Sequence, residues 1–248
     1  MNIRAVKTIW LRECRVYYRD KAGRISSIAR SVLWLVVFGG GFGAARFQGL
    51  GVDYQEFLFP GILAMSLLFT SIRSGISVIW DKEFGFMKEI LVSPASRFEI
   101  MAGKVLGGST IAMTEACIIL LLGPLVGANL TPLNVVASIA LMLLISLSLV
   151  SIGLIASSIM KTFEGFNTIM TFLIMPMFFL SGALFPVEQM PSWMSYVVAV
   201  NPLTYGVDAL RWVLVGVGHT PLAIDLAVLG LAAAVTMGFG VRAFNNRD

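Results

Sequence analysis

Six long apolar stretches alternate with shorter polar segments along the chain. They cover residues 29–45, 57–79, 105–127, 135–159, 165–184 and 222–241. At a rise of about 1.5 Å per residue, a helix of about 20 residues crosses a bilayer core of roughly 30 Å. The pattern therefore predicts an all-α polytopic membrane protein with six transmembrane helices, in which residues 1–248 form a single transmembrane domain.

The longest polar interruption, residues 80–104, separates the second predicted span from the third. Its charges of both signs surround an apolar minority: Phe84, Phe86, Met87, Ile90 and Leu91. This spacing predicts a short helix with one apolar and one charged stripe, held on the membrane surface where it can contact a soluble partner. The alternative is a solvated loop with one helical turn. Gly103 and Gly107, at the entrance to the third span, have the spacing of a close-packing helix face.

Residues 1–28 are strongly basic, and only Glu13 and Asp20 oppose the positive charge. Apolar residues recur there at near-helical spacing: Ile3, Val6, Ile9, Trp10, Val16 and Tyr17. The segment therefore predicts an amphipathic interface helix among the lipid headgroups, with a cationic face suited to anionic lipid. The alternative is a disordered basic tail.

Residues 186–221 are neither clearly a span nor clearly a loop. They hold two short apolar segments, 193–198 and 205–217, and the second is interrupted by Asp208 and Arg211. Both are too short to cross a bilayer core, and Trp and Tyr favour the membrane interface. We expect two short re-entrant helices that dip into one face of the membrane.

The distribution of basic residues predicts the orientation. Six spans place both termini on one side, and fifteen of the 18 Lys and Arg residues fall on that side. Cytoplasmic segments of membrane proteins are enriched in Lys and Arg, so both termini are expected in the cytoplasm. No basic stripe is interleaved with aromatic residues, so nucleic acid is not expected as a partner.

Motifs for nucleotide and metal chemistry are absent from the sequence. It contains no G-x-x-x-x-G-K-[ST] phosphate-binding loop, no paired-aspartate motif at a cytoplasmic membrane edge, and only one histidine, His219. We therefore expect no enzyme activity and no cofactor or metal bound by this chain.

The ionisable residues Arg73 and Glu115 lie well inside predicted spans. Intramembrane acids are costly and usually face a bundle interior or a wet cavity. Because the two residues lie at similar depths in antiparallel neighbours, we hypothesise that they form an ion pair. The alternatives are that Arg73 extends toward the cytoplasmic interface and that Glu115 lines a substrate path.

Two stretches resemble the membrane subunits of type-2 ABC transporters, particularly the branch that exports drugs and nodulation factors. The first runs from Lys82-Glu83-Phe84-Gly85 through Leu91-Val92-Ser93-Pro94-Ala95-Ser96-Arg97 to Gly103-Lys104. The second comprises Gly182-Ala183-Leu184-Phe185-Pro186, Met190-Pro191-Ser192-Trp193, Asn201-Pro202-Leu203-Thr204-Tyr205 and Leu210-Arg211. The likeness covers essentially the whole chain.

The resemblance implies a permease of a prokaryotic inner membrane that forms a homodimer and engages two copies of a separate ABC ATPase, which would bind ATP and Mg. The second and fifth spans would face each other across the dimer axis. The ATPase-docking residues would be Lys82, Glu83, Phe84, Gly85, Phe86, Lys88 and Glu89. The outer-gate residues would be Phe185, Pro186, Trp193, Asn201, Pro202, Tyr205 and Arg211.

We therefore expect an ATP-driven exporter that moves an amphipathic drug, lipid or lipid-linked glycan out of the cytoplasm or the inner leaflet. The alternatives are a passive pore and a membrane scaffold that recruits a soluble partner without transport.

Overall fold

A computed structural model describes residues 2–41, 52–86, 92, 95–160 and 162–245. Every regular element in these residues is a helix, which confirms the predicted all-α class. The helices are α1 (Ile3–Arg19), α2 (Lys21–Gly41), α3 (Tyr54–Arg73), α4 (Ile76–Glu83), α6 (Arg97–Leu120), η1 (Gly123–Val126), α7 (Pro132–Ile159), α8 (Phe163–Phe179), η2 (Val187–Gln189), α9 (Ser192–Val200), α10 (Pro202–Val215) and α11 (Leu222–Asn245).

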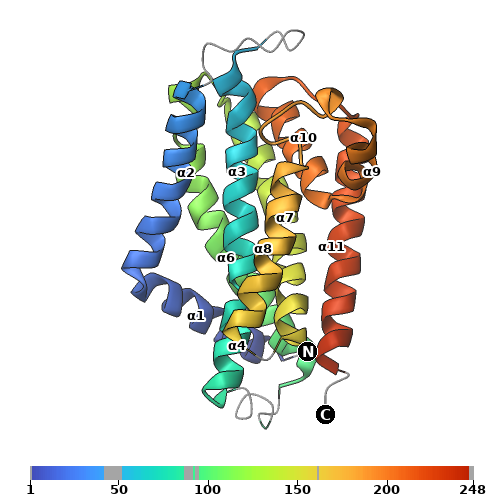
Figure 1. Cartoon of the computed structure of the whole chain (residues 1–248). Coiled ribbons are helices and arrows are strands. Elements are labelled where there is room, and N and C mark those ends of the chain that lie inside the picture. Colours follow the sequence, from blue (N-terminus) through green and yellow to red (C-terminus); the bar gives the residue numbers. More distant parts are fainter. Residues whose placement is uncertain (1, 42–51, 87–91, 93–94, 161, 246–248) are drawn as a thin grey trace.

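The long helices α2, α3, α6, α7, α8 and α11 run side by side along one axis (Figure 1). Helices α1 and α4 lie at one end of this bundle, where α11 also finishes. Helices α9 and α10 lie at the opposite end, beside the start of α11. We call these two ends the α4 end and the α9 end.

Five segments in the described residues are long and apolar enough to cross a membrane: α2, α3 continued into α4, α6, α7 and α11. The fifth predicted span corresponds to α8, which is apolar but only 17 residues long. The protein is therefore a multi-pass membrane protein by composition. The six-span layout and the re-entrant placement of α9 and α10 stay predictions.

The N-terminal helix ends earlier than predicted. Helix α1 stops at Arg19 and α2 begins at Lys21, so the break falls at Asp20 rather than at residue 28. The Asp20 carboxylate accepts a hydrogen bond of 2.8 Å from the backbone N–H of Gly23, which gives the first turn of α2 an acceptor for one of its free amides.

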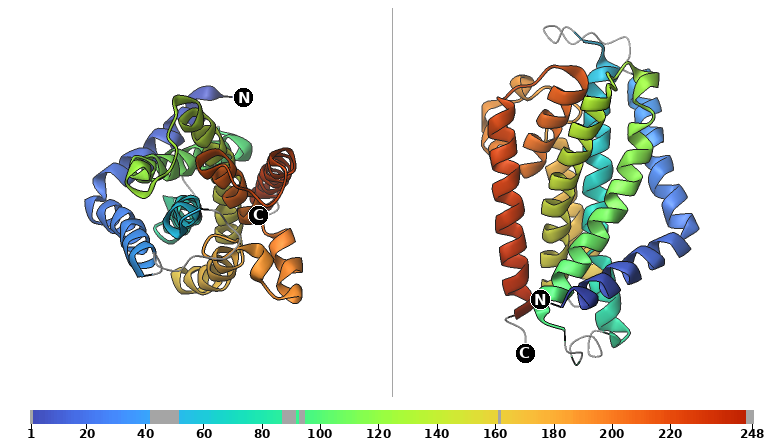
Figure 2. Two further views of the ribbon diagram at one scale, coloured as in Figure 1. Left: turned by 90° about the horizontal axis from the view of Figure 1, so that it is seen from above. Right: turned by 180° about the vertical axis from the view of Figure 1, so that it is seen from behind.

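Helix α3 forms the centre of the bundle. Residues 57–68 are buried without interruption, and α3 packs against α2, α6, α7, α8 and α10. Viewed from above, α3 lies inside a ring of other helices (Figure 2). Residues 57–68 of α3 therefore pack against helices of the same chain, and the expectation that the second span faces a second copy stays a prediction. Helix α8 does carry an exposed apolar face, because the Phe172 side chain is 78% exposed.

Close packing at Gly103 and Gly107 confirms the predicted small-residue face of α6. A Cβ atom added to Gly103 would lie 2.7 Å from the Cβ of Ile9, and one added to Gly107 would lie 2.7 Å from the Cβ of Glu13. The missing side chains therefore allow α1 to lie directly along the backbone of α6.

Replacing Gly107 with valine should force α1 away from α6. We expect Gly107→Val to lower the free energy of unfolding by about 1–3 kcal/mol, as overpacking does in dense interiors. The control is Gly230→Val on α11, where an added Cβ meets no atom within 4 Å. Chemical denaturation in detergent micelles measures both variants, and equal stability of the two would contradict this packing.

Candidate functional site

A buried lysine joins three helices at the α4 end. The Lys104 side chain on α6 is only 1% exposed. Its Nζ donates to Glu13 Oε1 on α1 at 2.9 Å, to Asp81 Oδ2 on α4 at 2.7 Å and to Ser77 Oγ at 3.1 Å. These acceptors use all three N–H donors of the ammonium group, which buried charge requires.

Arg12 completes this charge cluster. Its guanidinium makes a two-point contact with Asp81, with one hydrogen bond of 3.0 Å, and lies 3.7 Å from Glu13. The hydrogen bond to Asp81 raises the pKa of Arg12, so the guanidinium stays charged. Two cations and two acids balance, and we call Arg12, Glu13, Asp81 and Lys104 the basal cluster.

The start of α6 is held to the start of α1 by a second set of contacts. Ser96 accepts a hydrogen bond of 3.3 Å from the Glu99 amide, and Glu99 Oε2 accepts one of 2.9 Å from the Ser96 amide. Glu99 Oε1 also accepts a hydrogen bond from the Asn2 amide. The Ser-x-x-Glu spacing is the sequence signal of a capping box, and it would have identified this role of Glu99.

The residues predicted to dock the ATPase divide into two groups. Lys82 points inward, and its Nζ donates to the carbonyl oxygens of Ser157 (2.7 Å), Ser158 (3.0 Å) and Met160 (3.3 Å), so its charge stabilises the C-terminal end of α7. The residues that follow it point outward.

Glu83, Phe84, Gly85 and Phe86 are exposed, and the Phe84 side chain is 64% exposed. Gly85 has a φ of 78°, which ends the helical path after α4 at a position that suits glycine. The predicted docking residues Lys88 and Glu89 lie outside the described residues.

Glu115 lies in an open cavity of about 600 Å³ that is lined by residues of α1, α2, α3, α4, α6 and the start of α8. The residue is only 2% exposed, and three hydroxyl groups donate to its carboxylate: Tyr17 at 3.0 Å, Ser27 at 2.6 Å, and Thr70. Burial raises the pKa of the Tyr17 phenol, with a further contribution from Glu115, so Tyr17 remains a donor.

The predicted ion pair between Arg73 and Glu115 is wrong. Arg73 pairs with Asp20 at 3.7 Å, and both side chains are half-exposed. Arg73 does line the same cavity as Glu115. The bend between α1 and α2 brings Asp20 to Arg73, and it brings the hydroxyls of Tyr17 and Ser27 to Glu115, which the spacing along the spans could not predict.

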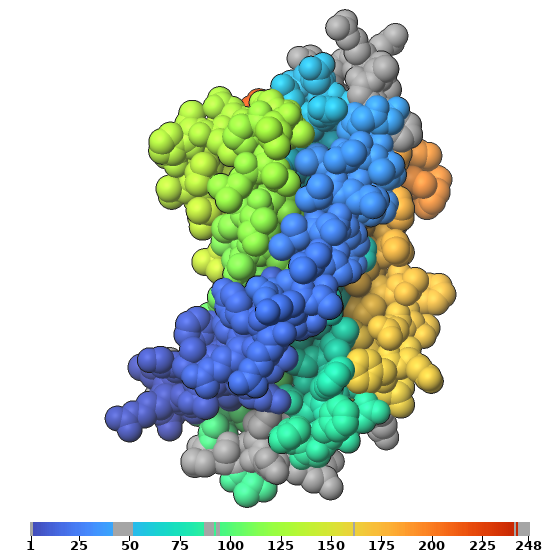
Figure 3. Space-filling model, turned by 90° about the vertical axis from the view of Figure 1, so that its left-hand side faces the viewer, coloured from blue at the N-terminus to red at the C-terminus, as the bar shows by residue number. Residues whose placement is uncertain are grey.

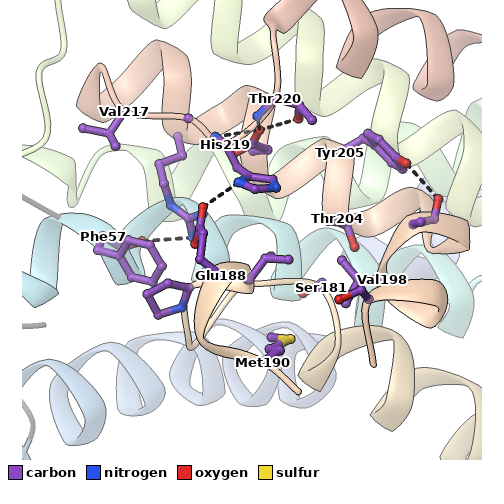
Figure 4. A pocket seen from close by; sticks show the side chains of 17 residues that line it. Phe57, Ser181, Glu188, Met190, Val198, Thr204, Tyr205, Val217, His219 and Thr220 are labelled. Atoms are coloured by element: carbon purple, nitrogen blue, oxygen red, sulfur yellow. Dashed lines mark hydrogen bonds and ion pairs between the residues drawn. The ribbon is translucent and has the colours of Figure 1, made fainter. Parts of the chain in front are cut away.

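A second cavity, of about 390 Å³, lies at the α9 end (Figure 4). Of the predicted outer-gate residues, Pro186, Tyr205 and Arg211 line it. Phe185 and Trp193 are exposed nearby in sequence but do not line the cavity.

Arg211 is buried rather than exposed at the membrane face. It donates to the Gly182 carbonyl at 2.8 Å and lies 3.8 Å from the ring centre of Phe57 on α3. Asn201 and Pro202 form the start of α10, where the Asn201 Oδ1 accepts a hydrogen bond of 3.1 Å from the Leu203 amide. These residues therefore fix α10 and the preceding turn against the bundle.

Sequence reasoning noted Asp208 but missed its role, which is to anchor the segment before α11. Its carboxylate accepts hydrogen bonds from the backbone amides of His219 (2.9 Å) and Thr220 (2.7 Å). The His219 ring in turn lies 2.5 Å from a carboxylate oxygen of Glu188, as Figure 4 shows. The sequence around Asp208 does not indicate that its carboxylate binds the backbone amide of His219, which lies 11 residues later.

Because Arg73 and Glu115 do not form an ion pair, substitutions at the two positions should affect stability independently. Arg73→Gln and Glu115→Gln should each lower the free energy of unfolding. The loss in the double variant should equal the sum of the two single losses within about 0.5 kcal/mol. The positive control is Tyr17→Phe with Glu115→Gln, which share a hydrogen bond and should be less than additive. Chemical denaturation measures the stability of each variant. The structure would be contradicted if the double variant of Arg73 and Glu115 were no less stable than either single variant.

Comparison with known proteins identifies the family. Residues 4–215 match the family described as ABC-2 type transporter. The transport permease ycf38 of Cyanophora paradoxa is 31% identical over 192 residues, which are 76% of this chain and 66% of ycf38. The inner membrane transport permease YadH of Escherichia coli (strain K12) is 25% identical over 230 residues, 91% of this chain and 88% of YadH.

A third relative, YbhR of Escherichia coli (strain K12), is named as a multidrug ABC transporter permease and is 32% identical over 166 residues, 64% of this chain and 44% of YbhR. The chain thus spans about two thirds of the length of ycf38 and less than half of YbhR. Membership of the family implies association with an ABC ATPase subunit. Because the family match covers most of its length, this multi-pass membrane protein belongs to the ABC-2 type transporter family of permeases.

Proposed function

We propose that the chain is the permease subunit of an ATP-driven exporter that moves an amphipathic drug, lipid or lipid-linked glycan out of the cytoplasm or the inner leaflet. Its family supports a transport role. Because the sequence has no phosphate-binding loop motif, the energy comes from a separate ATPase subunit, which binds ATP and Mg.

In this proposal the α4 end faces the cytoplasm of a prokaryotic cell. Helices α1 and α4, the start of α6 and the end of α11 lie at that end, and most of the Lys and Arg residues of the sequence fall in or next to these elements. The excess of basic residues supports this orientation, which would place the cavity at the α9 end on the outer side.

The exposed tip after α4 is the proposed docking site for the ATPase. One observation carries this assignment: Glu83, Phe84 and Phe86 directly follow two residues that are bonded to other helices. Asp81 bonds to α1 and α6 through the basal cluster, and Lys82 bonds to the end of α7. A force applied to the tip is therefore passed to α1, α6 and α7 through short charged contacts.

We further propose that two copies of the permease assemble with two copies of the ATPase. The exposed apolar face of α8, which includes Phe172, Met175 and Phe179, is the proposed contact with the second copy. Helices α9 and α10, held by Arg211 and Asp208, form the proposed outer gate.

Removing the exposed aromatic ring at the tip should release the ATPase. We expect Phe84→Ala, and Glu83→Gln to a smaller degree, to reduce the ATPase retained on the tagged permease by at least about tenfold, because central aromatic contacts dominate interface energies. Phe239→Ala on α11 is the matched control, since Phe239 is 63% exposed and Phe84 is 64% exposed. Full retention by the Phe84 and Glu83 variants would show that the docking site lies elsewhere.

The same preparation separates the exporter from a passive pore or a scaffold. In proteoliposomes holding permease and ATPase, an exporter accumulates substrate against a gradient only when ATP is supplied. Flux that does not depend on ATP would identify a pore, and ATPase binding without any flux would identify a scaffold.

A further inference from the structure

The cavity around Glu115 has the size and lining of a site for a small amphipathic molecule. Its volume of about 600 Å³ lies within the range of roughly 300–1,000 Å³ that is typical of ligand pockets. It extends from exposed aromatic residues of the α4 end to the buried carboxylate of Glu115. Figure 3 shows the face where α1 and α2 lie beside α4 and α8, four of the helices that contribute residues to its lining.

Apart from Glu115, the acids that line the cavity have cationic partners. Glu13 and Asp81 belong to the basal cluster, and Asp20 pairs with Arg73. Among the described residues, Glu115 has no cation within ion-pair distance. It is held by hydroxyl groups alone, which orient the carboxylate without neutralising its charge.

The arginines near Glu115 are directed elsewhere. Arg24 lies over the rings of Tyr17 and Tyr18 and donates to the Tyr18 carbonyl at 3.0 Å. Arg30 lies 4.9 Å from the ring centre of Phe69 and acts on Glu115 only through longer-range attraction. Within the part of the chain that the structure describes, the buried carboxylate therefore has no direct counter-ion.

Another part of the cavity lining is aromatic. The Trp80 ring is half-exposed and lies edge-on to Phe163 at 5.6 Å and tilted against Phe84 at 5.5 Å. All three rings line the cavity. Aromatic faces attract organic cations and also pack against apolar groups, so they suit both parts of an amphipathic cation.

We infer that this cavity binds an amphipathic organic cation, whose charged group lies toward Glu115 and whose apolar body packs against Trp80, Phe84 and Phe163. Arg24 and Arg73 also line the cavity and repel additional positive charge, so the ligand carries a single charge. This inference rests on the proposed export function and specifies its substrate class. The site lies within one chain, so binding does not require the ATPase.

Two ions of nearly the same shape and opposite charge test the inference. The purified full chain, in lipid nanodiscs without ATPase, is titrated with radiolabelled tetraphenylphosphonium and, in a separate sample, with radiolabelled tetraphenylborate. We expect saturable binding of the cation that Glu115→Gln weakens by at least about tenfold, as loss of a buried charge partner does. Tetraphenylborate should show no binding that depends on Glu115.

Two further variants control for folding and for surface charge. Glu164→Gln changes an exposed acid beside Phe163 that does not line the cavity, and it should bind like the unchanged protein. Trp80→Leu alters a half-exposed ring and should also weaken cation binding, so it decides the question if Glu115→Gln does not fold.

Cation binding that survives both Glu115→Gln and Trp80→Leu, or Glu115-dependent binding of tetraphenylborate as tight as that of the cation, would overturn the inference. Such a result would leave the proposed function intact if the ATPase still co-purifies and drives export. If the ATPase did not associate but cation binding still depended on Glu115, the proposed function would be overturned and the inference about the cavity would stand.

Discussion

The structure at the α4 end depends on the burial of one positive charge. An ammonium group removed from water must have its donors satisfied and its charge balanced, or it destabilises the fold by several kcal/mol. Lys104 meets this requirement with Glu13 from α1 and with Asp81 and Ser77 from the α3–α4 segment. Because these partners come from different parts of the chain, the requirement fixes the position of α1 against α6 and of α4 against both. The glycines on α6 permit the approach that these short contacts need.

This arrangement connects the two regions to which we assign function. The exposed tip after α4 directly follows Asp81, which belongs to the basal cluster, and Lys82, which bonds to the end of α7. The cavity around Glu115 shares its wall with the same cluster, since Arg12, Glu13 and Asp81 also line it. Helix α6 carries both Lys104 and Glu115, and α1 carries both Glu13 and Tyr17. A displacement of the tip by a bound ATPase would therefore change the shape of the cavity directly, without a long chain of intermediate contacts.

Features that depend on the spacing of nearby residues could be predicted from the sequence. Contacts between side chains that are far apart in the sequence could not. The apolar stretches located the long helices, the Gly103–Gly107 spacing located a close-packing face, and the short apolar segments after Pro186 located α9 and α10. The partners of Lys82, Arg73 and Lys104 were missed, because each depends on how α1, α4 and α7 meet in space. A charge in a polar segment looks the same in sequence whether it is exposed, like Glu83, or bonded to a helix end, like Lys82.

The central claim is that Lys104 holds α1 onto α6, and hydrogen–deuterium exchange of Lys104→Met tests it most directly. Removing the ammonium leaves Glu13 and Asp81 buried together without their shared cation. The account predicts faster amide exchange throughout α1 and α4, with α11 unchanged and with no such effect in Lys21→Met, which alters an exposed lysine. Exchange in α1 as slow as in the unchanged protein would contradict it.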